Sequence, residues 1–117
     1  MGAGLLCVGI LSASTLAGCG GGSTADPCRD APTYTRNVQP LIETACLGCH
    51  SQRLSGEARK GAPEPLNYDT FELIEPDIIA FANAFTSGAM PPADSGITVS
   101  RDERSIVSSW RRCGFLP

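Results

Sequence analysis

Cys46 and Cys49 stand three positions apart, and His50, the only histidine of the chain, follows directly. Side chains three positions apart share one face of a helical turn, so the two sulfurs point the same way. Thiols placed in this way each add to a vinyl group of one haem, and the adjacent imidazole reaches the iron. The spacing therefore predicts covalent haem attachment through Cys46 and Cys49, with His50 as an iron ligand.

The first 18 residues carry no charge and are mostly small or aliphatic. This run is too short and too rich in small residues for a membrane span. It ends in Leu16-Ala17-Gly18-Cys19, which resembles a bacterial lipobox. We expect residues 1–18 to be a lipoprotein signal peptide and Cys19 to carry the lipid. The alternative is an ordinary secretory signal with a chance cysteine.

No Lys or Arg precedes the apolar run, which predicts either a start site upstream or a weak signal. Residues 19–27 are expected to form a flexible, glycine-rich tether, and residues 28–117 the folded domain. The expected location is the periplasm-facing cell envelope of a bacterium, with the lipid on Cys19 anchoring the protein to the membrane. Gly20, by resemblance to Gram-negative lipoproteins, favours the outer membrane.

A haem iron in a domain of this size takes a second protein ligand, and no second histidine exists. Cleavage of the expected signal peptide would remove Met1, which leaves Met90 as the sole methionine of the mature domain. It lies between Gly88 and a proline pair, in a loop stiff enough to hold a thioether at the metal. A soft sulfur ligand favours ferrous iron and raises the reduction potential. We therefore predict His50 and Met90 as the axial ligands.

Helical periodicity precedes the haem motif. The apolar side chains from Tyr34 to Ala45 fall on one helical face. With Asn37 as the N-cap, the regular helix would start at Val38, and Pro40 would fall in its first turn, where a proline is tolerated. We expect this helix to end with or soon after the motif.

Three further helices are predicted, and no stretch shows the alternation of a strand. Residues 68–74 are expected to form a short helix with Asp69 as its cap, and residues 77–86 the next. The last helix opens with a capping box of Ser100 and Glu103. Its expected buried stripe consists of Ile106, Val107 and Trp110.

Basic residues do not exceed acidic ones, and the net charge of −3 argues against a nucleic-acid partner. Two basic groups are expected to be solvated surface. The first consists of Arg53, Arg59 and Lys60, for which part of a docking face is the alternative, and the second of Arg101, Arg104, Arg111 and Arg112. The second group also complements the dipole of the last helix, or meets a haem propionate or an acidic redox partner.

Cys28 and Cys113 bracket the domain, one before the first helix and one at the end of the last. Exported proteins oxidise such cysteines, so we predict a disulfide that contributes on the order of 4 kcal/mol. Cys46 and Cys49 have two other interpretations. A thioredoxin-like pair requires a βαβ setting, which the sequence lacks. A zinc site would need Cys28 or Cys113 as the fourth ligand beside His50.

The haem motif, the Gly88-x-Met90-Pro91 loop and a last helix with Trp110 resemble class I c-type cytochromes, in particular the monohaem bacterial domains and lipoproteins. The resemblance covers residues 34–114. It implies an all-α, cytochrome c-like fold of three to five short helices with long loops wrapped around the haem. It also implies that the first and last helices cross.

The same resemblance implies roles for single residues. The motif cysteines hold one covalently bound haem c, His50 is the proximal ligand and Met90 the distal ligand. A backbone carbonyl, of Pro63 or Pro65, accepts a hydrogen bond from the other nitrogen of His50.

These expectations describe an electron carrier rather than an enzyme. Both axial positions of the iron are filled by the protein, so no position is left for a substrate. The expected partners are redox proteins of the cell envelope, met in brief, small contacts. Two alternatives stay open: a haem-containing accessory subunit of an oxidoreductase, and a peroxidase or sensor if Met90 is a labile ligand.

Overall fold

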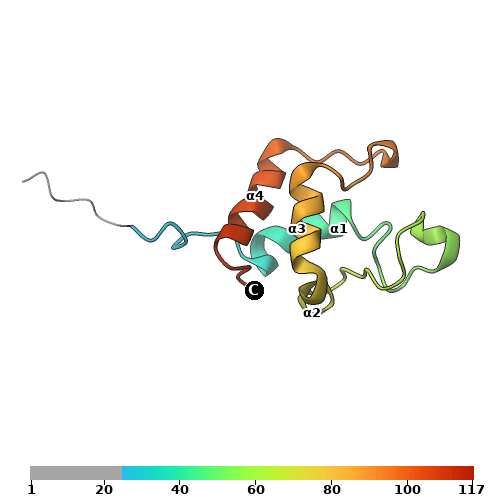
Figure 1. The fold of residues 1–117 in the computed structure, drawn as a ribbon, viewed down its shortest axis with the longest axis horizontal. Coiled ribbons are helices and arrows are strands. Elements are labelled where there is room, and N and C mark those ends of the chain that lie inside the picture. The colour runs from blue at the N-terminus through green and yellow to red at the C-terminus, as the bar shows by residue number, and fades with distance from the viewer. Residues whose placement is uncertain (1–24) are drawn as a thin grey trace, which may run out of the picture.

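The computed structural model describes residues 25–117, so the expected signal peptide 1–18, the lipid site Cys19 and most of the tether 19–27 lie outside the described residues. The described part consists of helices and loops and contains no strand (Figure 1), which confirms the all-α prediction. Its α-helices are α1 (Gln39–Ala45), α2 (Phe71–Ile74), α3 (Ile78–Ser87) and α4 (Arg101–Arg112). A π-helical turn covers Tyr34–Val38, and 3₁₀ turns cover Gly56–Arg59, Glu75–Asp77 and Ala93–Ser95.

The first helix begins earlier than the sequence predicted. The π-helical turn Tyr34–Val38 runs directly into α1. Its N-cap is Thr33, whose hydroxyl accepts the Arg36 N–H at 3.3 Å. The side chain of Asn37, the expected cap, instead accepts the Thr33 N–H at 3.1 Å. Pro40 lies in the first turn of α1, where a proline is tolerated.

The core lies between the first helix, α3 and α4. Trp110 of α4 is fully buried, and its ring centroid lies 6.2 Å from that of Tyr34 and 4.9 Å from that of Phe115. Helix α3, which Figure 1 shows beside α4, adds the buried rings of Phe81 and Phe85. Burial of each such ring stabilises the fold by about 1.5–3 kcal/mol.

The capping box at the start of α4 is confirmed. The Ser100 hydroxyl accepts the Glu103 N–H at 3.2 Å, and the Glu103 carboxylate accepts the Ser100 N–H at 2.7 Å. The Ser100 N–H, and then the Ser100 hydroxyl, which donates to the same carboxylate at 2.8 Å, lower the pKa of Glu103. Val107 and Trp110 of the predicted stripe are buried, and Ile106 is half-buried.

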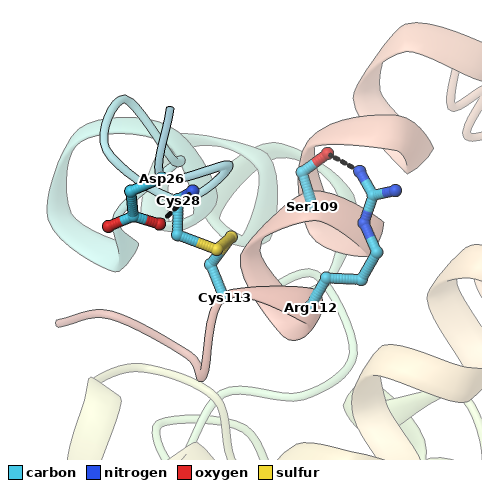
Figure 2. The surroundings of a disulfide bond; sticks show 5 residues. All are labelled: Asp26, Cys28, Ser109, Arg112 and Cys113. Atoms are coloured by element: carbon cyan, nitrogen blue, oxygen red, sulfur yellow. Dashed lines mark hydrogen bonds between the residues drawn. A yellow bond between two sulfur atoms is a disulfide. The ribbon is translucent and has the colours of Figure 1, made fainter. Parts of the chain in front are cut away.

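The two ends of the described chain are fastened to each other. Cys28 and Cys113, which are 85 positions apart, form a disulfide (Figure 2). The Leu116 carbonyl accepts both the Tyr34 N–H at 2.8 Å and the Trp110 indole N–H at 2.7 Å. The start of the first helix is therefore held against the end of the last.

Two long loops, residues 46–70 and 88–100, extend from the same side of the helices (Figure 1). They contain the motif and the methionine that the sequence marks for a haem. Among residues 25–117, no helix combines the length and the apolar character needed to cross a bilayer.

Candidate functional site

The haem motif lies directly after α1. The helix ends at Ala45 and Cys46 is its C-cap, so the regular helix stops before the motif and not after it. One more turn follows, because the Cys46 carbonyl accepts the N–H of Cys49 at 3.0 Å and of His50 at 2.9 Å. This turn keeps both sulfurs and the imidazole beside one cavity.

The cavity has a volume of about 380 Å³. Both motif cysteines, His50 and Met90 line it, so the structure brings together all four residues that the sequence marks for the haem. The rest of the wall is mainly apolar and includes the rings of Tyr68, Phe81 and Phe85. A concave, apolar site with a few convergent polar groups is the usual form of a cofactor site.

His50 is oriented by a backbone carbonyl. Its side chain is nearly buried, and Nδ1 lies 3.0 Å from the Leu66 carbonyl oxygen. A carbonyl only accepts, so this contact places the proton on Nδ1 and leaves Nε2 as a free donor of electrons to a metal. The prediction that the Pro63 or Pro65 carbonyl accepts this hydrogen bond is wrong, because the acceptor is the Leu66 carbonyl. The Pro63 carbonyl instead accepts a hydrogen bond from Arg59 at 2.7 Å.

The segment after Leu66 runs alongside the motif and holds it in place. The Tyr68 N–H donates to the His50 carbonyl at 2.8 Å, and the Tyr68 phenol donates to Asp77 at 3.0 Å. Burial and the hydrogen bond to Asp77 raise the pKa of Tyr68 above its usual value. The phenol therefore stays neutral in the wall of the cavity.

Asp69 fastens the chain just after His50. Its carboxylate accepts the Ser51 hydroxyl at 2.6 Å and the Gln52 N–H at 2.7 Å. The prediction that Asp69 caps the next helix is wrong, because Thr70 does so by accepting the Leu73 N–H at 3.4 Å. A tertiary contact thus uses the carboxylate that looked like a local cap.

The Met90 loop starts at the end of α3. Gly88 ends the helix with φ +85°, a conformation that favours glycine, and the Met90 N–H then donates back to the Ala84 carbonyl at 3.0 Å. Met90 is 40% exposed, so it lies at the open side of the cavity. The bond from Met90 to Pro91 is cis.

Arg104 of α4 holds the same loop. Its guanidinium donates to the Phe85 carbonyl, and to the Met90 carbonyl at 3.2 Å. It also lies over the Phe85 ring, 5.7 Å from the centroid. From the sequence, Arg104 was expected to be one of several solvated arginines. No local sequence pattern predicts its contacts, because both carbonyls come from a distant segment of the chain.

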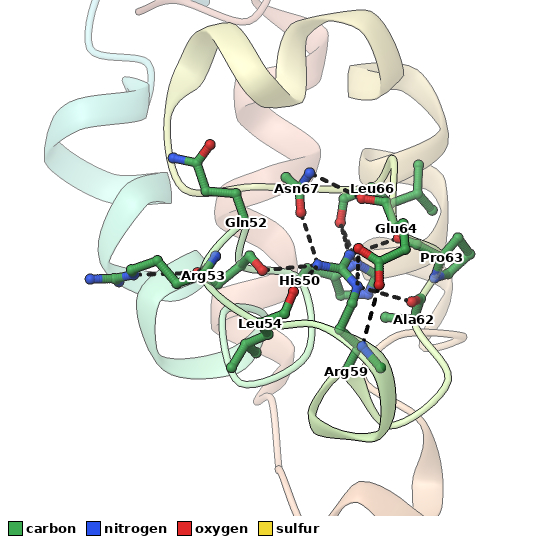
Figure 3. A network of polar contacts seen from close by, with 12 residues as sticks. His50, Gln52, Arg53, Leu54, Arg59, Ala62, Pro63, Glu64, Leu66 and Asn67 are labelled. Atoms are coloured by element: carbon green, nitrogen blue, oxygen red, sulfur yellow. Dashed lines mark hydrogen bonds and ion pairs between the residues drawn. The ribbon is translucent and has the colours of Figure 1, made fainter.

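Arg59 is the second arginine for which the prediction of solvated surface is wrong. It lies in the loop after the motif, among the backbone carbonyls of that loop (Figure 3), and it is only 1% exposed. Its guanidinium donates to the Leu66 carbonyl that also serves His50. A basic residue in a loop rich in glycine and proline carries the ordinary signature of exposed surface, so the sequence offered no signal of this burial.

The chemistry of the motif cysteines bears on the alternative interpretations. Burial and then the neighbouring Cys49 raise the pKa of Cys46 to about 12, whereas a redox-active pair needs a thiolate. Cys28 and Cys113 are bonded to each other, so neither supplies a fourth zinc ligand. Within the described ranges, no group of three or more His, Cys, Asp or Glu side chains is arranged for a metal ion.

Comparison with protein-family models, with curated proteins and with solved structures finds no match to this chain.

The donor set and the walls of the cavity fit a haem. Cys46 and Cys49 would hold the group covalently, and His50 and Met90, which line the same cavity, would bind its iron. The apolar wall suits a porphyrin face.

Proposed function

We propose that this protein is an electron carrier that binds one c-type haem through Cys46 and Cys49, with His50 and Met90 as axial ligands. One observation carries the proposal: two thiols, one oriented imidazole and one thioether line a single apolar cavity. No other pairing of a histidine with a methionine is available in the mature domain.

When bound, the haem supplies a one-electron couple between ferric and ferrous iron. The chain's own residues supply the rest. The two cysteines would fasten the group, and the Leu66 carbonyl keeps the Nδ1 proton in place, which leaves Nε2 free to bind the iron. Tyr68, Phe81 and Phe85 keep water from the inner wall of the cavity. With His50 and Met90 both bound to the iron, no position would be left for a substrate.

The proposal places the protein in the bacterial cell envelope, with the lipid on Cys19 holding the domain near a membrane. Its partners would be redox proteins that contact the open side of the cavity, where Met90 is exposed. Brief contacts of this kind bury little surface.

A second candidate is supported by the exposure of Met90. A ligand that is 40% exposed is more easily displaced than a buried one, which would open the iron to a small molecule, as in a peroxidase or a sensor. Carbon monoxide added to the reduced protein separates the two candidates. A carrier leaves its spectrum unchanged, whereas a ligand-open protein shifts it at once.

The test is to express the full chain with the haem attachment machinery and record its visible spectrum. We expect a sharp low-spin c-type spectrum that stays with the polypeptide after acid–acetone extraction. Replacing Cys46 and Cys49 with serine should abolish attachment, whereas the same change at Cys28 and Cys113 should leave it intact. A haem-free protein, or a haem that the solvent extracts, contradicts the proposal.

The distal ligand is tested separately. Met90→Ala should convert the low-spin spectrum to a high-spin or ligand-open one and lower the reduction potential, because the soft thioether favours ferrous iron. Ile79→Ala, at an exposed apolar residue of α3, is the matched control and should change neither. An unchanged spectrum in Met90→Ala would show that another group binds the iron.

A further inference from the structure

Arg59 combines almost complete burial with an unusual set of partners. Every hydrogen bond of its guanidinium goes to an oxygen that carries no formal charge (Figure 3). The acceptors are the carbonyls of Ser51, Leu54, Ala62, Pro63 and Leu66 and the side-chain oxygen of Asn67. A guanidinium has five N–H groups, and all are engaged here, so Arg59 has none left for a haem propionate.

The charge of Arg59 is poorly compensated. Within the described part of the chain, its ion-pair partner is Glu64, whose Oε2 lies 4.0 Å from Nε. The Glu64 side chain is 67% exposed, so water screens its charge, whereas the Arg59 side chain is 1% exposed. A buried positive charge, hydrogen-bonded to neutral oxygens but with only a screened counter-charge, therefore lies beside residues that line the cavity.

Arg59 and His50 share one acceptor. The Leu66 carbonyl oxygen lies 3.0 Å from Arg59 Nη2 and 3.0 Å from His50 Nδ1. An oxygen that already receives a charged donor has less electron density to offer a second donor. The Nδ1–H of His50 is then polarised less, and the imidazole donates fewer electrons through Nε2.

We propose that Arg59 is a positioning residue that raises the reduction potential of the haem through the Leu66 carbonyl and His50. This inference rests on the proposed function. Two effects act in the same direction, because a weaker electron donor at the iron favours the ferrous state and so does a buried positive charge nearby. Arg59 also ties the loop to the motif, and the experiment separates that structural role from the electronic one.

The first comparison is Arg59→Gln against Arg53→Gln, each in the haem-loaded full chain. Both remove one positive charge from the same loop, but the Arg53 side chain is 80% exposed and lacks a bond to Leu66. Arg59→Gln should shift the equilibrium towards ferric iron about tenfold, which is about 59 mV for a one-electron couple. Arg53→Gln should leave the potential near that of the unmodified protein.

Two milder variants keep Arg59 and so protect the test against misfolding. Asn67→Asp places a carboxylate where the Asn67 oxygen now accepts from Arg59 Nη1 at 2.9 Å, and it should lower the potential in the same direction. Glu64→Gln keeps an acceptor for the Gly56 N–H but removes the screened counter-charge, and it should raise the potential.

A second readout reports the hydrogen bond itself. In the diamagnetic ferrous protein, the proton resonance of His50 Nδ1–H should move downfield in Arg59→Gln, because the Leu66 carbonyl becomes a stronger acceptor. A purely structural Arg59 would give the opposite result: a looser loop, a lower melting temperature, and an Nδ1–H resonance that moves upfield.

Haem binding and the role of Arg59 are contradicted by different results. If the unmodified chain takes up no covalent haem, the proposed function is overturned and the role of Arg59 falls with it. If haem is bound and Arg59→Gln, Asn67→Asp and Glu64→Gln all keep the original potential, only the role of Arg59 is overturned.

Discussion

The imidazole of His50 and the phenol ring of Tyr68 are stacked, with their centroids 4.8 Å apart and their planes 18° from parallel. The same two residues are joined by the bond from the Tyr68 N–H to the His50 carbonyl. Together with the Leu66 carbonyl, these contacts restrict the ring of His50 on one nitrogen and one face. The surroundings of the His50 ring are therefore built by residues 66–68, which lie outside the motif.

Replacing Tyr68 separates its ring from its hydroxyl. Tyr68→Phe keeps the stack on His50 and loses the hydrogen bond to Asp77, so we expect a loss of about 0.5–1.5 kcal/mol in the free energy of unfolding. Tyr68→Leu also loses the stack and leaves a void, and we expect about 2–3 kcal/mol. Urea unfolding of both variants measures the difference. Equal losses would show that the stack contributes nothing.

Acid should destabilise the protein through Asp69. Burial acts to raise the pKa of this carboxyl, but the bonds from Ser51 and Gln52 outweigh it and the pKa is lowered. A carboxyl with a folded-state pKa below its unfolded value contributes stability above the usual pKa of about 3.9, and this is lost as the pH falls through the folded value.

The variant Asp69→Asn checks this pH dependence. It should cost about 1.5–3 kcal/mol near neutral pH, because hydrogen bonds to a charged group are lost. Its stability should then fall less steeply than that of the unmodified protein as the pH is lowered. Asp94→Asn, at an exposed aspartate, is the control and should keep the original profile. The same acid profile in Asp69→Asn and the unmodified chain would contradict the assignment.

The disulfide between Cys28 and Cys113 should stabilise the fold without serving the haem. Because it closes a long loop, changing both cysteines to serine should lower the free energy of unfolding by about 4 kcal/mol. The covalent haem should be retained, since neither sulfur lines the cavity. Urea unfolding with and without a reductant measures the stability, and the visible spectrum reports the haem. Loss of attached haem from a folded double variant would contradict this division of roles.

Under the proposed function, Arg104 should govern how firmly the Met90 loop holds its thioether to the iron. Arg104→Gln loses a charged donor to the carbonyls of Phe85 and Met90, so the loop is less restrained. A weakening of about 1.4 kcal/mol corresponds to roughly tenfold greater access of carbon monoxide to the reduced protein. Arg101→Gln, exposed in the same helix, should behave like the unmodified protein. Equal carbon monoxide binding in both variants would show that Arg104 does not restrain the ligand.

Several features could be predicted because the physics that creates them is local. The capping box of Ser100 and Glu103 depends on residues three positions apart, and the structure contains it. Helical periodicity likewise marked the buried faces of α3 and α4. The first helix was placed too late because a wide π-helical turn, capped by Thr33, has no distinct sequence pattern.

The features of the candidate site also separate into those that the local sequence predicts and those that depend on tertiary contacts. The sequence alone predicts Cys46, Cys49, His50 and Met90 as the sulfur and nitrogen donors, since spacing and the scarcity of histidine and methionine leave few choices. Their meeting at one cavity, the choice of Leu66 as acceptor, and the burial of Arg59 follow only from the tertiary structure. Each of these depends on a loop folding back on the motif, and such contacts are settled by packing and by the need of buried polar groups for partners.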